Sequence, residues 1–323
     1  MREIFIGETI HQKRQDLGLT QEELCMGLCD PSTLSRIENR KQTPSRNVAN
    51  ALLQRLGLPH DRYYALDIFL TASEAEADAL RAKIESCITR FQQSLGEERR
   101  QARLEALEHL ARLEAAAEAS DNIARQYILA ARAALGGEDG PYGFEERLDM
   151  LLEAIRLTVP RFDPEALDGR LYGIDEAGII SQIAETYSNA GQHEKAAGIF
   201  NQLLTYMQSH YQDVTHPSRY VSPAALSCAR ELYLAGRCED ALKTAELGYK
   251  ACLDYGFCQA LPGLLAIMAE CRHAMGEDEQ SKALFCQAYY LYKETGNAKG
   301  LADVEEEAAK RLGLTFPPQE GRA

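Results

Sequence analysis

The sequence predicts an all-α protein, in which a short N-terminal helix-turn-helix is followed by a stack of helix pairs, an α-solenoid. Three observations support this prediction. Two short helices with clear capping signals lie within residues 19–39, helical periodicity continues along the 323-residue chain, and a frame of alanine, glycine and aromatic residues recurs after residue 177. We expect a helix-turn-helix domain over residues 1–70, a helical connector over 71–120, and a repeat domain with a C-terminal capping helix over 121–323.

The composition is that of a globular protein, with 45% hydrophobic and 26% charged residues. The chain has no continuous apolar run long enough to cross a bilayer, and its N-terminus lacks the apolar core and cleavage site of a secretory signal. We therefore expect a cytoplasmic protein that makes no contact with membranes.

Motifs for catalysis and for metal binding are missing from the sequence. There is no GxSxG, P-loop, HExxH or glycine-rich dinucleotide fingerprint, and the seven histidines show no metal-ligand spacing apart from the loop pair His210 and His216. The nine cysteines form no CxxC pair, and we interpret them as small buried apolar residues in a reducing compartment. We expect no enzymatic activity, no catalytic residue, no metal and no cofactor.

The charge is unevenly distributed along the chain. Residues 1–70 hold nine Lys/Arg and nine Asp/Glu, so residues 71–323 hold the whole net charge of −14. Within the neutral part, Arg36, Arg40, Lys41 and Arg46 against Glu38 make a local charge of +3. An acidic body with a basic tip suits a protein that touches DNA only through its N-terminal head.

The helices of the head are predicted from their end signals. A first helix is expected over residues 5–17, and Thr20 starts the second through a capping box with Glu23. Leu19 and Leu24 occupy the positions of a hydrophobic staple. We expect this second helix to run to residue 28, and Asp30 and Pro31 then supply the N-cap and first position of a third helix, which leaves a turn of about one residue.

The third helix has one apolar face and one polar face. Leu34 and Ile37 are expected to pack against Leu24 and Leu28 of the helix before it. The polar side chains of residues 31–33 and 35–36 then face away from this contact, as the side of a helix that enters a major groove does.

At these residues the head resembles the helix-turn-helix of the Cro/CI/XRE repressors. The matching residues are Leu19, Thr20, Gln21, Glu23, Leu24, Thr33, Ser35, Arg36, Ile37, Glu38, Asn39 and Pro44. A shortened turn that contains Cys29, followed by the sequence SRIE, is similar to the RRNPP family of peptide-responsive regulators. The resemblance implies that Arg14 pairs with Glu38, and that the protein is a dimeric transcription regulator controlled by a short signalling peptide.

The resemblance also implies which residues contact double-stranded DNA. Base contacts are expected from Ser32 and Arg36, with Pro31 and Thr33 beside them. Gln21, Arg40 and Lys41 are expected to bind phosphates. Because one small head contacts few base pairs, we expect a homodimer that binds two half-sites.

Further helices are predicted between the head and the repeats. A fourth helix is expected from Thr43-Pro44 to Leu56, and a short fifth helix over residues 61–70. The Ala, Glu, Arg and Leu-rich segment 73–119 predicts two more helices, with a capping box at Ser73 and a break at Gly96. This pair is either a connector or a dimerisation element.

The repeat frame resembles that of tetratricopeptide repeats. Its members are Ala184, Tyr187, Gly191, Ala196 and Phe200, then Ala229, Gly236 and Ala241, then Ala269, Gly276, Phe285 and Ala288. A weaker unit is expected over residues 121–159, interrupted by a loop at 136–143, and a capping helix over 299–312. The tail that follows, PPQEGRA, is expected to fray.

A concave face of such repeats suits an extended peptide. Counting from the repeat frame, the candidate peptide-binding residues are Asn122, Glu185, Asn189, Arg230 and Tyr233. Glu270 is a further inward position of the frame and, like Glu185, suits a basic side chain or an N-terminal amine. The asparagine amides suit a peptide backbone, the arginine a carboxylate and the tyrosine an apolar side chain.

Two other hypotheses stay open at this point. The protein is alternatively an interaction module whose repeats sequester a partner protein, with DNA binding secondary, or a phage-type lysis–lysogeny regulator with the same mechanism and other target genes. Salt-dependent binding to palindromic DNA distinguishes the interaction module from either regulator.

Overall fold

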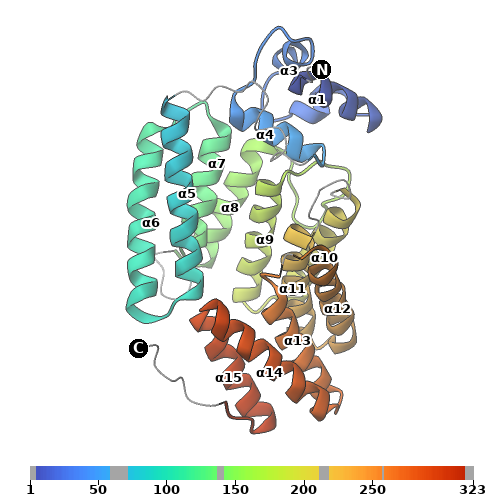
Figure 1. The fold of residues 1–323 in the computed structure, drawn as a ribbon. Coiled ribbons are helices and arrows are strands. Elements are labelled where there is room, and N and C mark those ends of the chain that lie inside the picture. Colours follow the sequence, from blue (N-terminus) through green and yellow to red (C-terminus); the bar gives the residue numbers. More distant parts are fainter. Residues whose placement is uncertain (1–4, 59–71, 137–141, 211–217, 257, 317–323) are drawn as a thin grey trace. The chain divides into compact units, whose positions relative to one another are not determined.

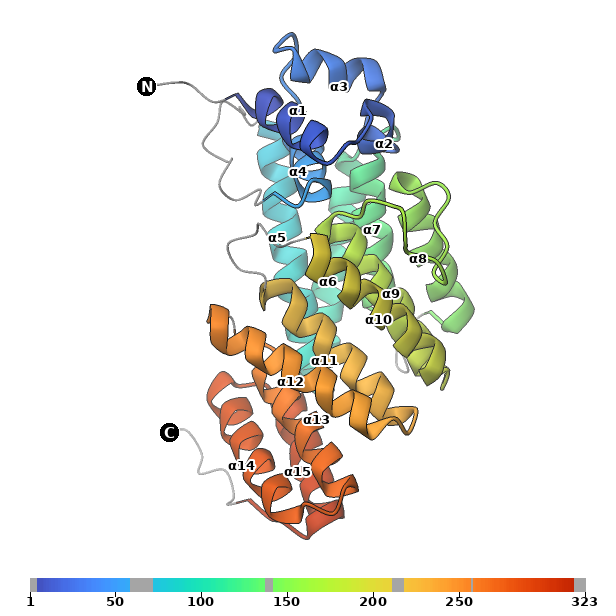
Figure 2. The ribbon, with the colours of Figure 1, turned by 90° about the vertical axis from the view of Figure 1, so that its right-hand side faces the viewer.

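The computed structural model describes residues 5–58, 72–136, 142–210, 218–256 and 258–316, and within these ranges it contains helices and no strands. The helices follow one another from N- to C-terminus (Figures 1 and 2). Their bounds are α1 Ile6–Asp16, α2 Gln21–Cys25, α3 Pro31–Glu38, α4 Arg46–Arg55, α5 Ala72–Gln93, α6 Gly96–Ala116, α7 Asn122–Ala134, α8 Phe144–Thr158, α9 Ile174–Asn189, α10 His193–His210, α11 Ser218–Leu234, α12 Cys238–Tyr255, α13 Leu261–Ala274, α14 Asp278–Thr295 and α15 Ala298–Leu312. The predicted all-α fold is confirmed.

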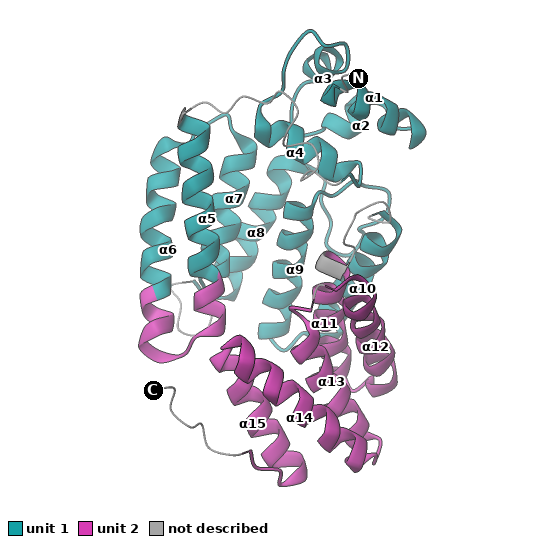
Figure 3. Ribbon diagram, viewed as in Figure 1, with its two compact units in different colours: residues 1–88, 102–215 teal, residues 89–101, 216–323 magenta. Residues whose placement is uncertain are grey.

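The chain divides into two compact units (Figure 3). The first unit holds residues 1–88 and 102–215, and so includes the head together with α7 to α10. The second unit holds residues 89–101 and 216–323, which includes α11 to α15.

The helices α1 to α4 enclose a small apolar core. Its fully buried members are Ile10, Leu24, Cys25, Leu34, Ile37, Leu52, Leu53 and Leu56, and Leu19 and Leu28 pack against it. Leu34 and Ile37 of α3 therefore point into the head, as their spacing predicted. The burial of this apolar face fixes which face of α3 remains outside.

The turn between α2 and α3 is longer than we predicted. The second helix ends at Cys25 and not at residue 28, because Met26 leaves the helical region with φ −49° and ψ 121°. Gly27 follows in the left-handed region at φ +72°, where a glycine is favoured. A β-carbon at this position would lie 2.4 Å from the carbonyl oxygen of Thr158, so Gly27 also permits a close contact with the end of α8.

Two further helix starts differ from their predicted positions. The fourth helix begins at Arg46, because Ser45 rather than Thr43 caps it by accepting a hydrogen bond from the Val48 amide. The helix α5 begins at Ala72, so Ser73 is already helical and cannot be its N-cap. The fifth head helix predicted over 61–70 and the fraying tail over 317–323 lie outside the described residues.

The repeat frame corresponds to antiparallel helix pairs. In the first unit α7 pairs with α8 and α9 with α10, and in the second unit α11 pairs with α12 and α13 with α14. Small residues permit these close contacts, since a β-carbon on Gly248 of α12 would lie 2.8 Å from that of Ala225. The C-terminal core contains Phe285, Ala288 and Tyr289 of α14.

The structure also describes the state of the cysteines and bears on the predictions about metal ligands and membrane-spanning helices. The nine cysteines are free thiols, of which five are buried and Cys258 is exposed. The described residues contain no group of three or more His, Cys, Asp or Glu side chains that is suited to a metal ion. No helix in the described ranges is both long enough and apolar enough to span a bilayer.

Candidate functional site

The helix α3 presents a polar face outside the core of the head. Pro31, Ser32 and Arg36 are exposed, and Thr33 is half-buried. Arg36 makes no ion pair or side-chain hydrogen bond with any residue that the structure describes, so its guanidinium is available to an external ligand. This face has the composition expected of a helix that reads base edges.

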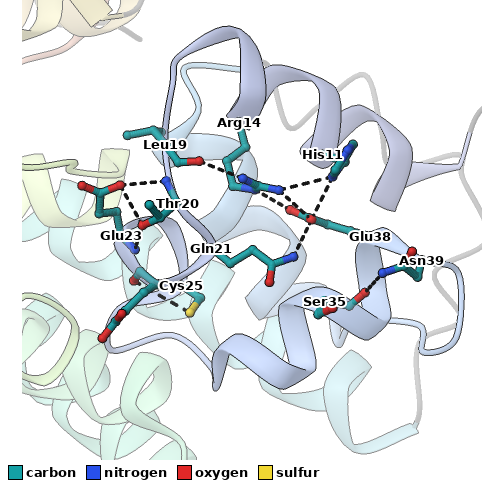
Figure 4. A network of polar contacts seen from close by, with 11 residues as sticks. His11, Arg14, Leu19, Thr20, Gln21, Glu23, Cys25, Ser35, Glu38 and Asn39 are labelled. Carbon is teal, nitrogen blue, oxygen red and sulfur yellow. Dashed lines mark hydrogen bonds and ion pairs between the residues drawn. The ribbon is translucent and has the colours of Figure 1, made fainter.

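A buried network fixes α3 against α1 (Figure 4). Arg14 Nε donates to Glu38 Oε1 at 2.7 Å and Arg14 Nη2 donates to Glu38 Oε2 at 2.9 Å, which is a bidentate ion pair. Gln21 Nε2 donates to the same carboxylate at 2.7 Å, and His11 Nδ1 lies 2.9 Å from it. Arg14 also donates to the carbonyl oxygen of Leu19 at 2.7 Å. The pairing of Arg14 with Glu38 that the resemblance implied is present.

The network determines the ionisation of Glu38. Burial opposes the charged form, but hydrogen bonds from Arg14, His11 and Gln21 outweigh it and lower the pKa of Glu38. Glu23 has a lowered pKa for a related reason, since the amide and hydroxyl of Thr20 both donate to its carboxylate. The predicted capping box at Thr20 is therefore confirmed.

The candidate phosphate-binding residues differ in their surroundings. Gln21 is engaged with Glu38 through its amide nitrogen. Arg40 has φ +59°, its guanidinium lies 3.9 Å from the centre of the Phe5 ring, and it forms an ion pair with Glu8. Lys41 is exposed, and its amide donates to the carbonyl oxygen of Arg36 at 2.8 Å. The roles of Gln21, Arg40 and Lys41 in DNA binding stay predictions.

A second buried arginine connects the head to the repeats of the same unit. Arg55, at the end of α4, lies 2.6 Å from Glu176 of α9, and the side chains are only 3% and 5% exposed. Arg55 also donates to the carbonyl oxygens of Leu24, Met26 and Thr158, at 3.1, 2.6 and 2.9 Å. This contact was not predicted from the sequence, because its partners are 121 residues apart and neither stands in a recognisable motif.

The candidate peptide-binding residues of the first unit do not form one cluster. The head contacts the end of α8 and the start of α9. Asn122 begins α7, the antiparallel partner of α8, whereas Asn189 ends α9. Because α9 has 16 residues, Asn189 lies about 22 Å along its axis from the end near the head. Glu185 is exposed on α9, and the amides of Asn122 and Asn189 form no side-chain hydrogen bond with described residues.

The second unit does bring chemically active groups together. Arg311 of α15 lies 3.2 Å from Glu270 of α13 and 2.6 Å from Glu307, and its guanidinium carbon is 5.5 Å from the ring centre of Tyr233 on α11. Arg230, one turn before Tyr233, is exposed and acts on the charge of Glu270. Sequence analysis identified Arg230, Tyr233 and Glu270 but missed Arg311, which we assigned only to a capping helix.

The carboxyl group of Glu270 is unusual among these residues. Burial raises its pKa to about 7, and the charge of Glu307 adds to this effect, while Arg311 and Arg230 oppose it. A group that changes charge near neutral pH in a half-buried cluster is a candidate ligand contact.

Comparison with known proteins extends this description. Residues 10–63 match the helix-turn-helix family. No curated protein matches the sequence. The head is therefore a helix-turn-helix domain, and its match covers only the N-terminal part of the chain.

Solved structures match nearly the whole chain. PlcR from Bacillus thuringiensis, in complex with the peptide PapR7 and DNA, is 16% identical with a TM-score of 0.55, and the match covers 96% of this chain and 99% of PlcR. ComR from S. thermophilus, in complex with DNA and its signalling peptide ComS, is 12% identical with a TM-score of 0.50, covering 96% and 100%. The competence regulator ComR from Streptococcus vestibularis, in its apo form, is 13% identical with a TM-score of 0.51, covering 95% and 98%.

These matches define a class of fold, a helix-turn-helix head followed by tetratricopeptide-like repeats. PlcR and ComR are RRNPP-type regulators, so the predicted resemblance is confirmed at the level of the fold. The PlcR and ComR proteins named above are regulators and not enzymes, which agrees with the expectation that this chain has no enzymatic function.

Proposed function

We propose that the chain is a cytoplasmic transcription regulator that binds double-stranded DNA through α3 and is controlled by a short signalling peptide bound to its repeats. The observation on which the proposal chiefly depends is the two-sided character of α3. Leu34 and Ile37 are buried in the head, while Ser32 and Arg36 are exposed and their side chains form no hydrogen bond or ion pair with the described residues. Complexes of PlcR and ComR with both DNA and peptide support it by analogy of fold.

In this proposal α3 reads the major groove. Arg36 is suited to a bidentate contact with guanine, and Ser32 and Thr33 to shorter contacts with base edges. Gln21, Arg40 and Lys41 hold the backbone phosphates, and Pro31 lies at the end of α3 that enters the groove. The ion pair of Arg14 with Glu38 fixes the orientation of α3 within the head.

We further propose that two copies bind one operator. A single helix in the major groove contacts few base pairs, so two heads on half-sites about 34 Å or a multiple apart would supply the affinity. Light scattering after gel filtration should then give twice the chain mass of 35.9 kDa. A monomer on palindromic DNA would contradict the dimer while leaving the reading of bases by α3 intact.

A genome-wide selection of DNA fragments by the purified full chain tests DNA recognition. We expect a palindromic site that Arg36→Ala loses, with a cost of about 1–3 kcal/mol in binding at the contacted base. Arg112→Ala is the matched control, because Arg112 is also exposed but lies on α6. Two salt concentrations separate this site from non-specific phosphate binding.

The selection is repeated in the presence of synthetic peptides, since the free protein sometimes requires its ligand in a switch of this kind. If no site is recovered in either condition, or if Arg36→Ala changes nothing, the DNA-binding proposal is wrong. The alternative in which the repeats sequester a partner protein would then be favoured.

Candidate peptide contacts occur separately in each unit. In the second unit, Glu270 suits an N-terminal amine or a basic side chain, Arg230 suits a carboxylate, and Tyr233 suits an apolar side chain. In the first unit, Asn122, Glu185 and Asn189 are exposed or half-exposed on α7 and α9. The two asparagine amides suit a peptide backbone, and Glu185 suits a basic side chain or an N-terminal amine. Peptide binding then shifts the equilibrium between two arrangements of the heads, although the peptide itself does not contact DNA.

A library of synthetic heptapeptides with free termini tests peptide binding to the full chain. We expect peptides selected by the natural protein to bind at least tenfold more weakly to Tyr233→Ala and to Glu270→Gln. Lys243→Ala is the control, because Lys243 is exposed on α12, the other helix of the α11–α12 pair. Equal binding by all three variants would exclude the cluster of Tyr233, Glu270 and Arg311 as the peptide site.

A further inference from the structure

We propose that a cavity inside the first unit is a second ligand site, which binds a small amphiphilic carboxylate. The cavity has a volume of about 630 Å³, is open to solvent on one side, and is lined by the head and by α8, α10 and the segment 161–171. Cavities of a few hundred to a thousand Å³ are typical of small-molecule sites. The site goes beyond the proposed function, because neither α3 nor the peptide candidates line it.

The inner wall of the cavity is predominantly apolar. Leu19 and Met26 contribute from the head, and Val159, Leu171 and Tyr206 contribute from the repeats. Met26 is 45% exposed although it follows directly on a buried helix end, and the flexible thioether adapts to ligands of different shape. A hydrocarbon or aromatic group bound here would be shielded from water on several sides.

The charges around the cavity are not equivalent. Arg55 is already bound to Glu176 and to three carbonyl oxygens, and Glu23 is bound to Thr20. The remaining charged groups are Arg161, Arg170 and Asp168, which form no ion pair or side-chain hydrogen bond within the described part of the chain.

These remaining groups have a net charge of +1. Two guanidinium groups that have no ion-pair partner among the described residues and lie beside an apolar wall suit an anion with an apolar body. A guanidinium matches a carboxylate with two parallel hydrogen bonds. We therefore assign the polar end of the ligand to Arg161 and Arg170, and its apolar body to the wall of Leu19, Met26 and Leu171.

Such a ligand would contact the head and the repeats together. A ligand stabilises the arrangement in which it makes the most contacts, so occupancy favours the docked arrangement that Arg55 and Glu176 already hold. A ligand in this site would therefore act on the head, and it is chemically distinct from a peptide bound to the repeats.

A single tryptophan reports on the cavity, because the natural chain contains none. Thr205 is exposed on α10 and lines the cavity, so Thr205→Trp places the reporter at the site. Gln208→Trp is the matched control, because Gln208 is exposed on the same helix but does not line the cavity. The probe is 12-bromododecanoate below its micelle concentration, since bromine quenches a tryptophan that it touches.

We expect saturable quenching of Trp at position 205 and little at position 208. Adding Arg161→Gln and Arg170→Gln to the reporter variant should weaken the probe at least tenfold, whereas adding Arg112→Gln should not change it. Circular dichroism and the melting temperature establish that each variant is folded. The neutral 12-bromododecan-1-ol should bind at least tenfold more weakly than the acid.

Three results would overturn the proposal. Equal quenching at positions 205 and 208 would show adsorption on the surface, and equal binding of acid and alcohol would exclude the role of the arginines. Unchanged affinity in the folded Arg161→Gln, Arg170→Gln variant would exclude it as well. These outcomes do not depend on DNA or peptide binding, so the site is judged independently of the proposed function.

Discussion

Two glutamates, one in each unit, both have largely buried side chains and yet differ in their pKa. The side chain of Glu38 is 2% exposed and that of Glu270 is 14% exposed. The pKa of Glu38 is lowered, whereas burial raises the pKa of Glu270 to about 7. Burial alone therefore does not determine the charge of either group.

The difference lies in the number of donors. Glu38 accepts from Arg14 through two bonds and also from Gln21, with His11 beside it. Glu270 has one guanidinium at 3.2 Å, which Glu307 shares at 2.6 Å. A carboxylate with a full set of donors is a structural element, and one with an incomplete set is available to a ligand. Glu38 therefore stabilises the head, whereas Glu270 of the second unit changes its charge near neutral pH.

The largest effect is expected from removing the cation of Glu38. Arg14→Leu leaves a carboxylate buried without its ion pair, so the head should lose about 3–5 kcal/mol of unfolding free energy. Urea denaturation monitored through the amides of α1 and α3 measures this loss.

The matched control is Arg100→Leu, which removes an ion pair with Glu97 whose side chains are 65% and 78% exposed. Its cost should be below about 1 kcal/mol. If both substitutions cost the same, the network around Glu38 does not hold α3 in place.

The head also shows what could be predicted from the sequence. The capping box of Thr20 and Glu23 and the apolar face of α3 were predicted correctly, because each depends on residues a few positions apart. The turn after Cys25 was not, since Gly27 was read as part of a helix. Its left-handed conformation is favoured by the fit against Thr158 of α8, which no local pattern contains.

The candidate sites were less predictable than the fold, for the same reason. Tyr233 and Glu270 follow from the repeat frame, but Arg311 joins them from 41 residues beyond Glu270. The pair of Arg55 and Glu176 spans 121 residues and depends on how the head packs on the repeats. Contacts between distant elements require the tertiary structure, whereas periodicity describes only one element at a time.

The pH dependence of the second unit should show the opposite sign from that of the head. An acid whose pKa is raised on folding binds its proton more tightly in the folded state, so stability falls as the pH rises from about 4.5 through about 7. Glu270→Gln removes this slope and should stabilise the unit by about 3 kcal/mol at pH 8 relative to the natural protein. Urea denaturation at pH 5 and pH 8 measures both values.

Glu239→Gln, an exposed position on α12 of the same unit, is the control and should leave the slope unchanged. A slope that persisted in Glu270→Gln would show that another group is responsible. The raised pKa of Glu270 would then not account for the pH dependence of the second unit.

The smallest effect is expected from removing one donor of Glu38 while its arginine remains. Gln21→Ala should cost the head about 1–2 kcal/mol at pH 7, because a hydrogen bond to a charged group is lost. Because the pKa of Glu38 is lowered on folding, its contribution is present above the unfolded pKa of 4.5 and is lost as the pH falls through the folded value.

That acid limb should therefore move to higher pH in Gln21→Ala. Gln12→Ala removes a similar bond to Asp16 on the exposed side of α1 and should cost less than about 0.5 kcal/mol, with no movement of the limb. The predicted phosphate contact of Gln21 makes a separate claim, that the salt dependence of DNA binding becomes weaker in the same variant. A variant that loses stability but keeps its salt dependence would assign Gln21 to Glu38 alone, and phosphate binding would then be left to Arg40 and Lys41.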